Sequence, residues 1–120
     1  MGYSIVWEKQ GAVCVYNGIP TLDELAAALT SVHQHIDFDQ FRYAIHDFSG
    51  AADLHPGATD LSTLIAQALG ASYTNPRIRT AIVAVHTNIL HIAQQFAAGT
   101  GLENKIVASL QAARDWLHER

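Results

Sequence analysis

Apolar residues at the beginning of the chain are spaced as in a β-hairpin followed by a helix. Residues 3–8 and 12–16 are rich in β-branched and aromatic side chains, and Gly11 supplies the turn between them. Residues 21–24 (TLDE) match a capping box, in which the Thr hydroxyl and the Glu carboxylate each satisfy a free amide at the start of a helix. The helix that begins there carries an apolar stripe suited to packing on a sheet. Its members are Leu22, Leu25, Ala26, Leu29, Val32 and Ile36.

The remainder of the chain alternates between strands and helices. Residues 41–48 predict a third strand, and the helix after it is expected to end at Gly70. Residues 80–85 are continuously apolar, which is typical of a central strand covered on both faces, so we place them in the middle of the sheet. The remaining expected elements are a helix capped by Thr87 and ended by Gly99 and Gly101, a strand over 105–108, and a helix capped by Ser109.

The predicted order of elements is ββαβαβαβα. Strand-helix-strand repeats imply a mostly parallel sheet, to which the first hairpin adds one antiparallel edge. The chain has 120 residues and a mass of 13.0 kDa, the size of one ordinary domain, and 49% of its residues are hydrophobic. We therefore expect a single α/β domain over residues 1–120, built around one core.

Charge and composition narrow the classes of partner and location. The net charge is −4 and only seven Lys and Arg are scattered along the chain, which argues against nucleic acid. No apolar run approaches the roughly 18 residues that span a bilayer, and the N-terminus lacks a signal-peptide pattern. The single cysteine, Cys14, excludes an internal disulfide and is expected in a buried strand. We therefore expect a cytoplasmic protein with no integral membrane association.

The histidines and the short motifs do not assemble a catalytic or metal-binding pattern. There are seven histidines, but His33 and His35 lie two residues apart and would not face each other on a helix. No GxSxG elbow, paired-carboxylate motif or glycine-rich phosphate loop appears, and the glycines at 99 and 101 follow a helix instead of a strand. We therefore predict a protein that is not an enzyme and that uses neither a metal ion nor a cofactor.

Polar residues gather where the predicted parallel strands end. Parallel strands deliver their C-terminal ends to one edge of a sheet, where helix N-termini also point free amides, so we expect a partner or ligand to bind there. The competing interpretation is that these residues bond to nearby backbone and only hold the loops in place. The predicted site consists of Asp47, Ser49, His55, Thr59, His86 and Asn88.

Three segments, together with the element order, resemble the SpoIIAA-like group of the STAS domain family. They are residues 47–50 (DFSG), 76–84 (PRIRTAIVA) and 112–117 (AARDWL). The resemblance covers nearly the whole chain and implies a regulatory or protein-interaction module without enzymatic activity. STAS domains of the anti-sigma-factor antagonist type bind a kinase partner. They are switched by phosphorylation of a serine that opens the helix after the third strand.

The sequence departs from the STAS pattern at this switch. The family's serine-bearing stretch falls near residues 55–58 (HPGA), which contain no serine, and Thr59 is the nearest hydroxyl. Some relatives share the fold of lipid-carrying Sec14-type domains, which implies a small apolar ligand in a pocket near the strand ends as the alternative function. The sequence leaves the oligomeric state open, a homodimer included.

Overall fold

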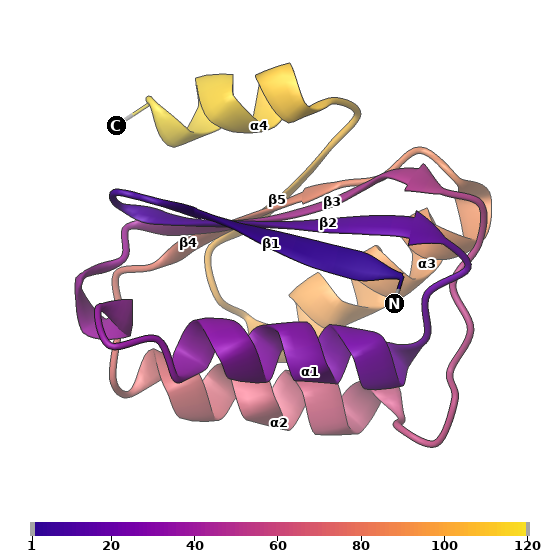
Figure 1. Ribbon diagram of the computed structural model, residues 1–120, viewed down its shortest axis with the longest axis horizontal. Helices are drawn as coiled ribbons and strands as arrows, with labels where there is room; N and C mark the ends of the chain where they lie inside the picture. The colour runs from indigo at the N-terminus through magenta and orange to yellow at the C-terminus, as the bar shows by residue number, and fades with distance from the viewer. Residues whose placement is uncertain (1, 120) are drawn as a thin grey trace.

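The computed structural model describes residues 2–119 and consists of a five-stranded mixed sheet with helices on both faces (Figure 1). Strand β1 pairs with β2 antiparallel, and every other neighbouring pair is parallel. The predicted α/β class and element order are confirmed. In sheet order, the strands are β1 (Tyr3–Glu8), β2 (Gly11–Gly18), β3 (Tyr43–Ala51), β4 (Arg79–Val83) and β5 (Asn104–Val107).

Three helices cover one face of the sheet, and the last helix covers the other (Figure 1). Parallel neighbours need a crossover between them, and one helix lies in each of the three crossovers from β2 to β5. A short 3₁₀ turn, η1 (Phe38–Gln40), precedes β3. The helices are α1 (Leu22–His33), α2 (Leu61–Ser72), α3 (Thr87–Thr100) and α4 (Leu110–Leu117).

The predicted capping box begins α1. The Thr21 hydroxyl accepts the Glu24 amide at 3.3 Å, and the Glu24 carboxylate accepts the Thr21 amide at 3.0 Å. The predicted apolar stripe packs on the sheet through Leu22, Leu29 and Val32. The expectation that Ile36 belongs to this stripe is wrong, because the helix ends at His33 and the Ile36 side chain is 90% exposed.

The position of β4 within the sheet corrects a second expectation. Residues 80–85 were expected to form the middle strand, but β3 lies in the middle and β4 lies between β3 and β5. The hairpin adds two strands on one side of β3, which shifts the centre away from β4. The strand also ends at Val83, and Val85 is 60% exposed.

Three helix ends differ from the sequence expectation. His86 is the N-cap of α3 without a side-chain capping bond, and Thr87 is the first helical residue. Helix α2 continues past Gly70, and α3 continues past Gly99 to end at Thr100, with Gly101, the second of its two predicted stop residues, as its C-cap. A Cβ at Gly99 would lie 2.4 Å from Cδ1 of Ile65, so this glycine permits the close packing of α3 on α2.

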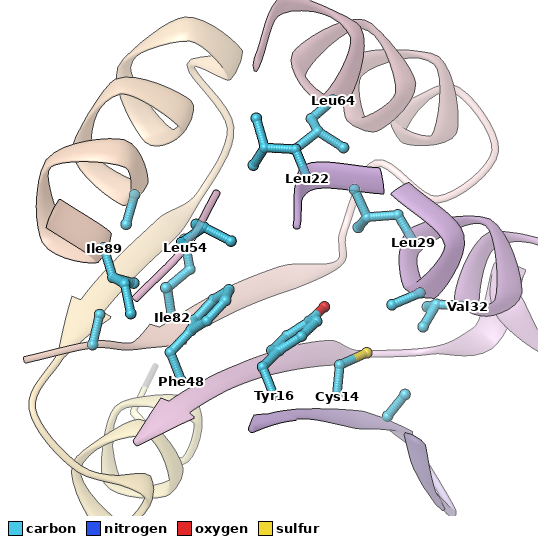
Figure 2. Close-up of a cluster of buried hydrophobic side chains, with 14 of the residues drawn as sticks. Cys14, Tyr16, Leu22, Leu29, Val32, Phe48, Leu54, Leu64, Ile82 and Ile89 are labelled. Atoms are coloured by element: carbon cyan, nitrogen blue, oxygen red, sulfur yellow. The ribbon is translucent and has the colours of Figure 1, made fainter. Parts of the chain in front are cut away.

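Alternation along the inner strands divides the buried side chains between two cores. On β2, Cys14 and Tyr16 belong to the larger core under α1 to α3, whereas Val13 belongs to the smaller core under α4. Figure 2 shows the larger core, in which the Tyr16 and Phe48 rings stack with centroids 4.4 Å apart. The buried members of the smaller core are Val13, Ile45, Ala81, Val83 and Ala113.

A hydrogen-bonded polar pair lies inside the larger core. The Tyr16 hydroxyl is 2.9 Å from Nδ1 of His46, and both residues are buried. Burial lowers the pKa of His46 to about 4, with a further contribution from nearby His33. Burial also raises the pKa of the Cys14 thiol to about 11. These groups are therefore uncharged at neutral pH, as an apolar core requires.

Replacing Ile82 by Asp tests the position of β4. Ile82 is 5% exposed and lies in the larger core, so the substitution buries a charge without a partner. We expect the free energy of unfolding to fall by about 3 to 5 kcal/mol, measured by urea denaturation. The control Ile36→Asp, on an exposed side chain, should change stability by no more than about 0.5 kcal/mol. Equal stability of the two variants would contradict the assignment of Ile82 to the core.

The low pKa of His46 predicts a loss of stability in mild acid. The unfolded chain takes up a proton near pH 6.5 and the folded chain only near pH 4, so falling pH favours unfolding between these values. The slope contributed by one such group reaches about 1.4 kcal/mol per pH unit. The double variant Tyr16→Phe with His46→Leu removes the imidazole without leaving the phenol unpaired. Its urea midpoint should depend less on pH across this window, and an unchanged dependence would refute a neutral, buried His46.

Candidate functional site

The loops after β2 and β3 are paired with each other at the C-terminal edge of the parallel strands. The arrowheads of β2 and β3 in Figure 1 point to this edge. The amide of Leu22 donates to the carbonyl of His55 at 2.8 Å, and the amide of His55 donates to the carbonyl of Pro20 at 3.0 Å. This bridge holds the loop after β3 against the start of α1.

Asp53 lies at the centre of the polar groups on this edge. The Asn88 side-chain amide donates to Asp53 Oδ1 at 2.8 Å and to the carbonyl of Leu54 at 3.1 Å. Nε2 of His55 lies 3.5 Å from Asp53 Oδ2, and Nδ1 of His86 lies 4.0 Å from Oδ1. We call Asp53, His55, His86 and Asn88 the Asp53 cluster.

The hydrogen bonds of the Asp53 cluster favour an ionised carboxylate. The Asn88 side chain contributes most to the lowered pKa of Asp53, followed by the Leu54 amide and then by the charges of His86 and His55. Nδ1 of His86 is buried and makes no hydrogen bond to another residue between 2 and 119. The Asp53 carboxylate is therefore ionised at neutral pH, and the buried Nδ1 of His86 lies beside it without a hydrogen bond to the described residues.

Thr59 belongs to a separate contact with the N-terminus of α1. Its hydroxyl donates to Asp23 Oδ1, and the Ala58 amide donates to Asp23 Oδ2 at 3.0 Å. These two bonds lower the pKa of Asp23, with the larger share from Thr59. Gly57 has a φ of 65° and its Cα faces Asp23 so closely that a Cβ would lie 2.3 Å from Oδ2. Thr59 thus fastens the loop before α2 to α1.

Asp47 and Ser49 were predicted to lie at the end of the third strand, but both lie within β3, which continues to Ala51. Asp47 is 7% exposed and lies in register with Val15 on β2 and Val83 on β4. Its carboxylate accepts the Ser49 amide at 2.9 Å. The described contacts link neither side chain to the Asp53 cluster.

The structure therefore brings three of the six predicted site residues together, and it adds a carboxylate that the sequence interpretation missed. His55, His86 and Asn88 surround Asp53, whereas Thr59 contacts Asp23. Asp53 stands in an irregular loop just beyond a strand, so neither periodicity nor a motif marks it. Asp53 comes close to Asn88 only in the folded chain, where the loop after β3 lies against the start of α3.

The first turn of α2 also differs from the expectation for the STAS switch. Residues 55–58 do not open the helix, which begins at Leu61 with Asp60 as its N-cap. The hydroxyls in the first turn are those of Ser62 and Thr63, and both donate to Asp60 Oδ1, at 2.9 and 2.7 Å. The sequence interpretation missed these two hydroxyls because it assigned the family's serine-bearing stretch to residues 55–58.

Two apolar side chains are exposed at the same edge. Ile19 follows β2 and is 53% exposed, and Val85 follows β4 and is 60% exposed. Asp53 follows β3, the strand between them. The edge therefore carries the hydrogen-bonded Asp53 cluster after β3 and one exposed apolar side chain after each of the two neighbouring strands.

The larger core contains an apolar cavity of about 50 Å³ between the sheet and α1 to α3. Leu29, Phe48, Leu64 and Ile82 are among the side chains that line it. Sites for small molecules typically occupy about 300 to 1,000 Å³. The cavity is therefore much smaller than the pocket that the lipid-binding alternative requires.

Neither a membrane-spanning helix nor a metal-binding group is found among residues 2–119. No helix in this part of the chain is long and apolar enough to cross a membrane. Within the same residues, no three His, Cys, Asp or Glu side chains are grouped closely enough to hold a metal ion.

Comparison with solved structures defines the fold as SpoIIAA-like. The anti-sigma factor antagonist SpoIIAA in its unphosphorylated form matches with a TM-score of 0.63 and 12% identity, over 98% of this chain and 99% of that chain. The phosphorylated form of the Bacillus cell fate determinant SpoIIAA matches with a TM-score of 0.60 and 12% identity, over 97% and 99%. The fold implied by the sequence resemblance is therefore confirmed.

A third match comes from a protein with the same fold. It is an uncharacterized protein of the DUF3478 family with a SpoIIAA-like fold from Shewanella loihica PV-4, with a TM-score of 0.54 and 17% identity over 96% of this chain and 91% of that chain. No protein-family model and no curated protein sequence matches the chain. The likeness is thus one of fold.

The hydrogen bond from Asn88 predicts a measurable change in the ionisation of Asp53. In the variant Asn88→Ala, the pKa of Asp53 should rise toward its ordinary value of 3.8, because the main group that stabilises the carboxylate is removed. Titration of the carboxyl carbon by NMR measures this pKa directly. The control Asn104→Ala, whose side chain bonds to Thr100 and Leu102, should leave it unchanged. The same pKa in both variants would contradict the Asp53–Asn88 contact.

Proposed function

We propose that the chain is a non-enzymatic regulatory module that acts by binding another protein at the C-terminal edge of its parallel strands. The observation that carries this proposal is the exposure of Ile19 and Val85 on the two sides of the Asp53 cluster. The matched SpoIIAA is named as an anti-sigma factor antagonist, a protein that regulates another protein. A cytoplasmic location, expected from the sequence composition, is part of the same proposal.

The arrangement of the edge suits recognition by a protein partner. Exposed apolar side chains supply binding energy when a partner covers them, and fixed polar groups set the register of the contact. His55 has a side chain that is 59% exposed beside the Asp53 carboxylate, so both groups are accessible to a partner. The backbone bridge between residues 20–22 and His55 holds this surface in one conformation, which lowers the entropy cost of binding.

The contacts of the Asp53 cluster support binding instead of catalysis. Nucleophilic catalysis by Ser, Thr or Cys requires the hydroxyl or thiol to lie within hydrogen-bonding distance of a base. His55 and His86 approach Asp53, but their described contacts include no Ser, Thr or Cys side chain. The nearby Thr59 hydroxyl is engaged by Asp23, and the Cys14 thiol is buried in the core.

Substitution of Val85 tests whether the edge binds a protein. Val85→Glu places a charge on an exposed side chain, so the fold should persist while an apolar contact with the partner is lost. We expect capture of partner proteins from cells that express the chain to fall roughly tenfold or more, measured by quantitative mass spectrometry. The matched control Ile36→Glu, at an exposed apolar side chain after the C-terminus of α1, should retain the parent's partners.

The double variant His86→Ala with Asn88→Ala separates recognition from loop support. If the polar cluster contacts the partner, capture falls while the thermal midpoint stays close to that of the parent. If these residues only hold loops, the midpoint falls and the partners that bind the folded fraction are unchanged. An unchanged set of partners in both this variant and Val85→Glu would overturn the assignment of the edge.

A further inference from the structure

A concave surface lies at the edge of the sheet opposite the Asp53 cluster, where the parallel strands begin. It is a groove of about 890 Å³, formed by the β1–β2 turn, the segments that enter β3 and β4, and the end of α4. This volume falls within the range of about 300 to 1,000 Å³ that is typical of small-molecule sites. We call this surface the basic groove, for the side chains of Lys9, Arg42, Arg77, Arg79 and Arg114 that line it.

Cationic residues are concentrated in the basic groove although the chain as a whole is acidic. The chain contains seven Lys and Arg and has a net charge of −4. Six of these seven lie within the described residues, and five of those six line the groove; the sixth is Lys105 on β5. Such a distribution places most of the described fixed positive charge on one edge.

Two of the arginines are held by the protein itself. Arg114 forms two hydrogen bonds to the Glu8 carboxylate, at 3.0 and 2.8 Å. Nε of Arg79 donates to Glu103 at 3.1 Å, and its guanidinium lies 4.0 Å from the centre of the Trp116 ring. These two side chains therefore form fixed walls of the groove.

The other three cations have no such partner. Lys9, Arg42 and Arg77 are exposed and form no ion pair with another residue between 2 and 119. The acidic side chains that line the groove are Asp37 and Glu119. The five cations are offset by these two carboxylates and by Glu8 and Glu103, which pair with Arg114 and Arg79. The groove therefore has a net charge of +1, whereas the chain as a whole has a net charge of −4.

A buried asparagine fixes the backbone that carries Arg42 and Arg77. Asn75 is 2% exposed, and its side-chain amide donates to the carbonyls of Phe38 and Phe41 at 2.8 and 2.7 Å. Its side-chain oxygen accepts the amide of Arg77 at 3.3 Å. One residue thus ties the segment before β3 to the segment before β4, so the two unpaired arginines are carried on a preorganised backbone.

We propose that the basic groove binds a small organic anion that carries two or more phosphate groups, held by Arg42 and Arg77. The planar guanidinium presents paired donors that match phosphate oxygens, and each phosphate supplies more charge and more acceptors than a carboxylate. A nucleic acid is a poorer occupant, because its extended phosphate chain needs many cations and the chain as a whole has a net charge of −4. The concave shape and the limited number of cations both favour a small ligand.

Titration with tripolyphosphate tests this proposal. Calorimetry should detect binding with a dissociation constant below about 1 mM that weakens as salt is added. The double variant Arg42→Gln with Arg77→Gln should weaken binding roughly tenfold or more, since it removes both unpaired arginines. Amide chemical-shift changes should include Gln10, Arg42 and Arg77.

The control is Lys105→Gln, which removes one positive charge outside the groove and should leave the affinity within about twofold of the parent. Orthophosphate, sulfate and citrate are titrated in parallel and should bind more weakly than tripolyphosphate. The proposal is overturned if tripolyphosphate does not bind, if Lys105→Gln weakens it as much as the double variant, or if citrate binds equally well. It is also overturned if the shift changes map to the Asp53 cluster.

Discussion

The two-residue alternation of side chains along β2 and β3 is the constraint on which the rest of the structure depends. On β2, Cys14 and Tyr16 enter the core under α1 to α3, and Val13 enters the core under α4. A shift of one residue in register would move His46 and Phe48 into the smaller core and Ile45 into the larger one. The hydrogen bond between Tyr16 and His46, and the stacking of Tyr16 on Phe48, both require the observed register. Because that register fixes where each strand ends, it also places the loops that carry Asp53 and Arg42.

Parallel strands then give the two edges of the sheet different roles. The edge at which the strands end receives the N-termini of α1 and α2, and Asp23 and Asp60 lie there, where carboxylates compensate the helix dipole. The edge at which the strands begin receives the C-terminus of α4, where Nη1 of Arg79 donates to the carbonyls of Leu117 and Glu119 at 3.4 and 3.2 Å. The capping of helix ends therefore places carboxylates at the first edge and a guanidinium at the second.

The sequence predicted those features that depend on local pattern, and it failed where position depends on distant parts of the chain. The capping box at Thr21 was correct because its two hydrogen bonds join residues three apart. The middle place of β3 could not be predicted from the apolar run at 80–85, because it depends on how many strands lie on each side. At the candidate site, His86 and Asn88 were found from their place after a strand. Asp53 was missed because these two partners lie more than thirty residues from it in sequence.

The same distinction separates charges that stabilise the fold from charges that are available to a ligand. Asp23 and Asp60 accept hydrogen bonds from loop and helix amides, and Arg114 is paired with Glu8, so these charges are stabilised by partners within the protein. Arg42 and Arg77 have no comparable partner among residues 2–119, yet buried Asn75 holds the backbone beside both. The exposed charges of Arg42 and Arg77 add little to folding, since an exposed guanidinium is equally well solvated on a mobile loop. The fixed backbone that carries them is useful to a ligand, because preorganised donors lose less entropy when they bind. The basic groove is therefore better explained by binding than by stability.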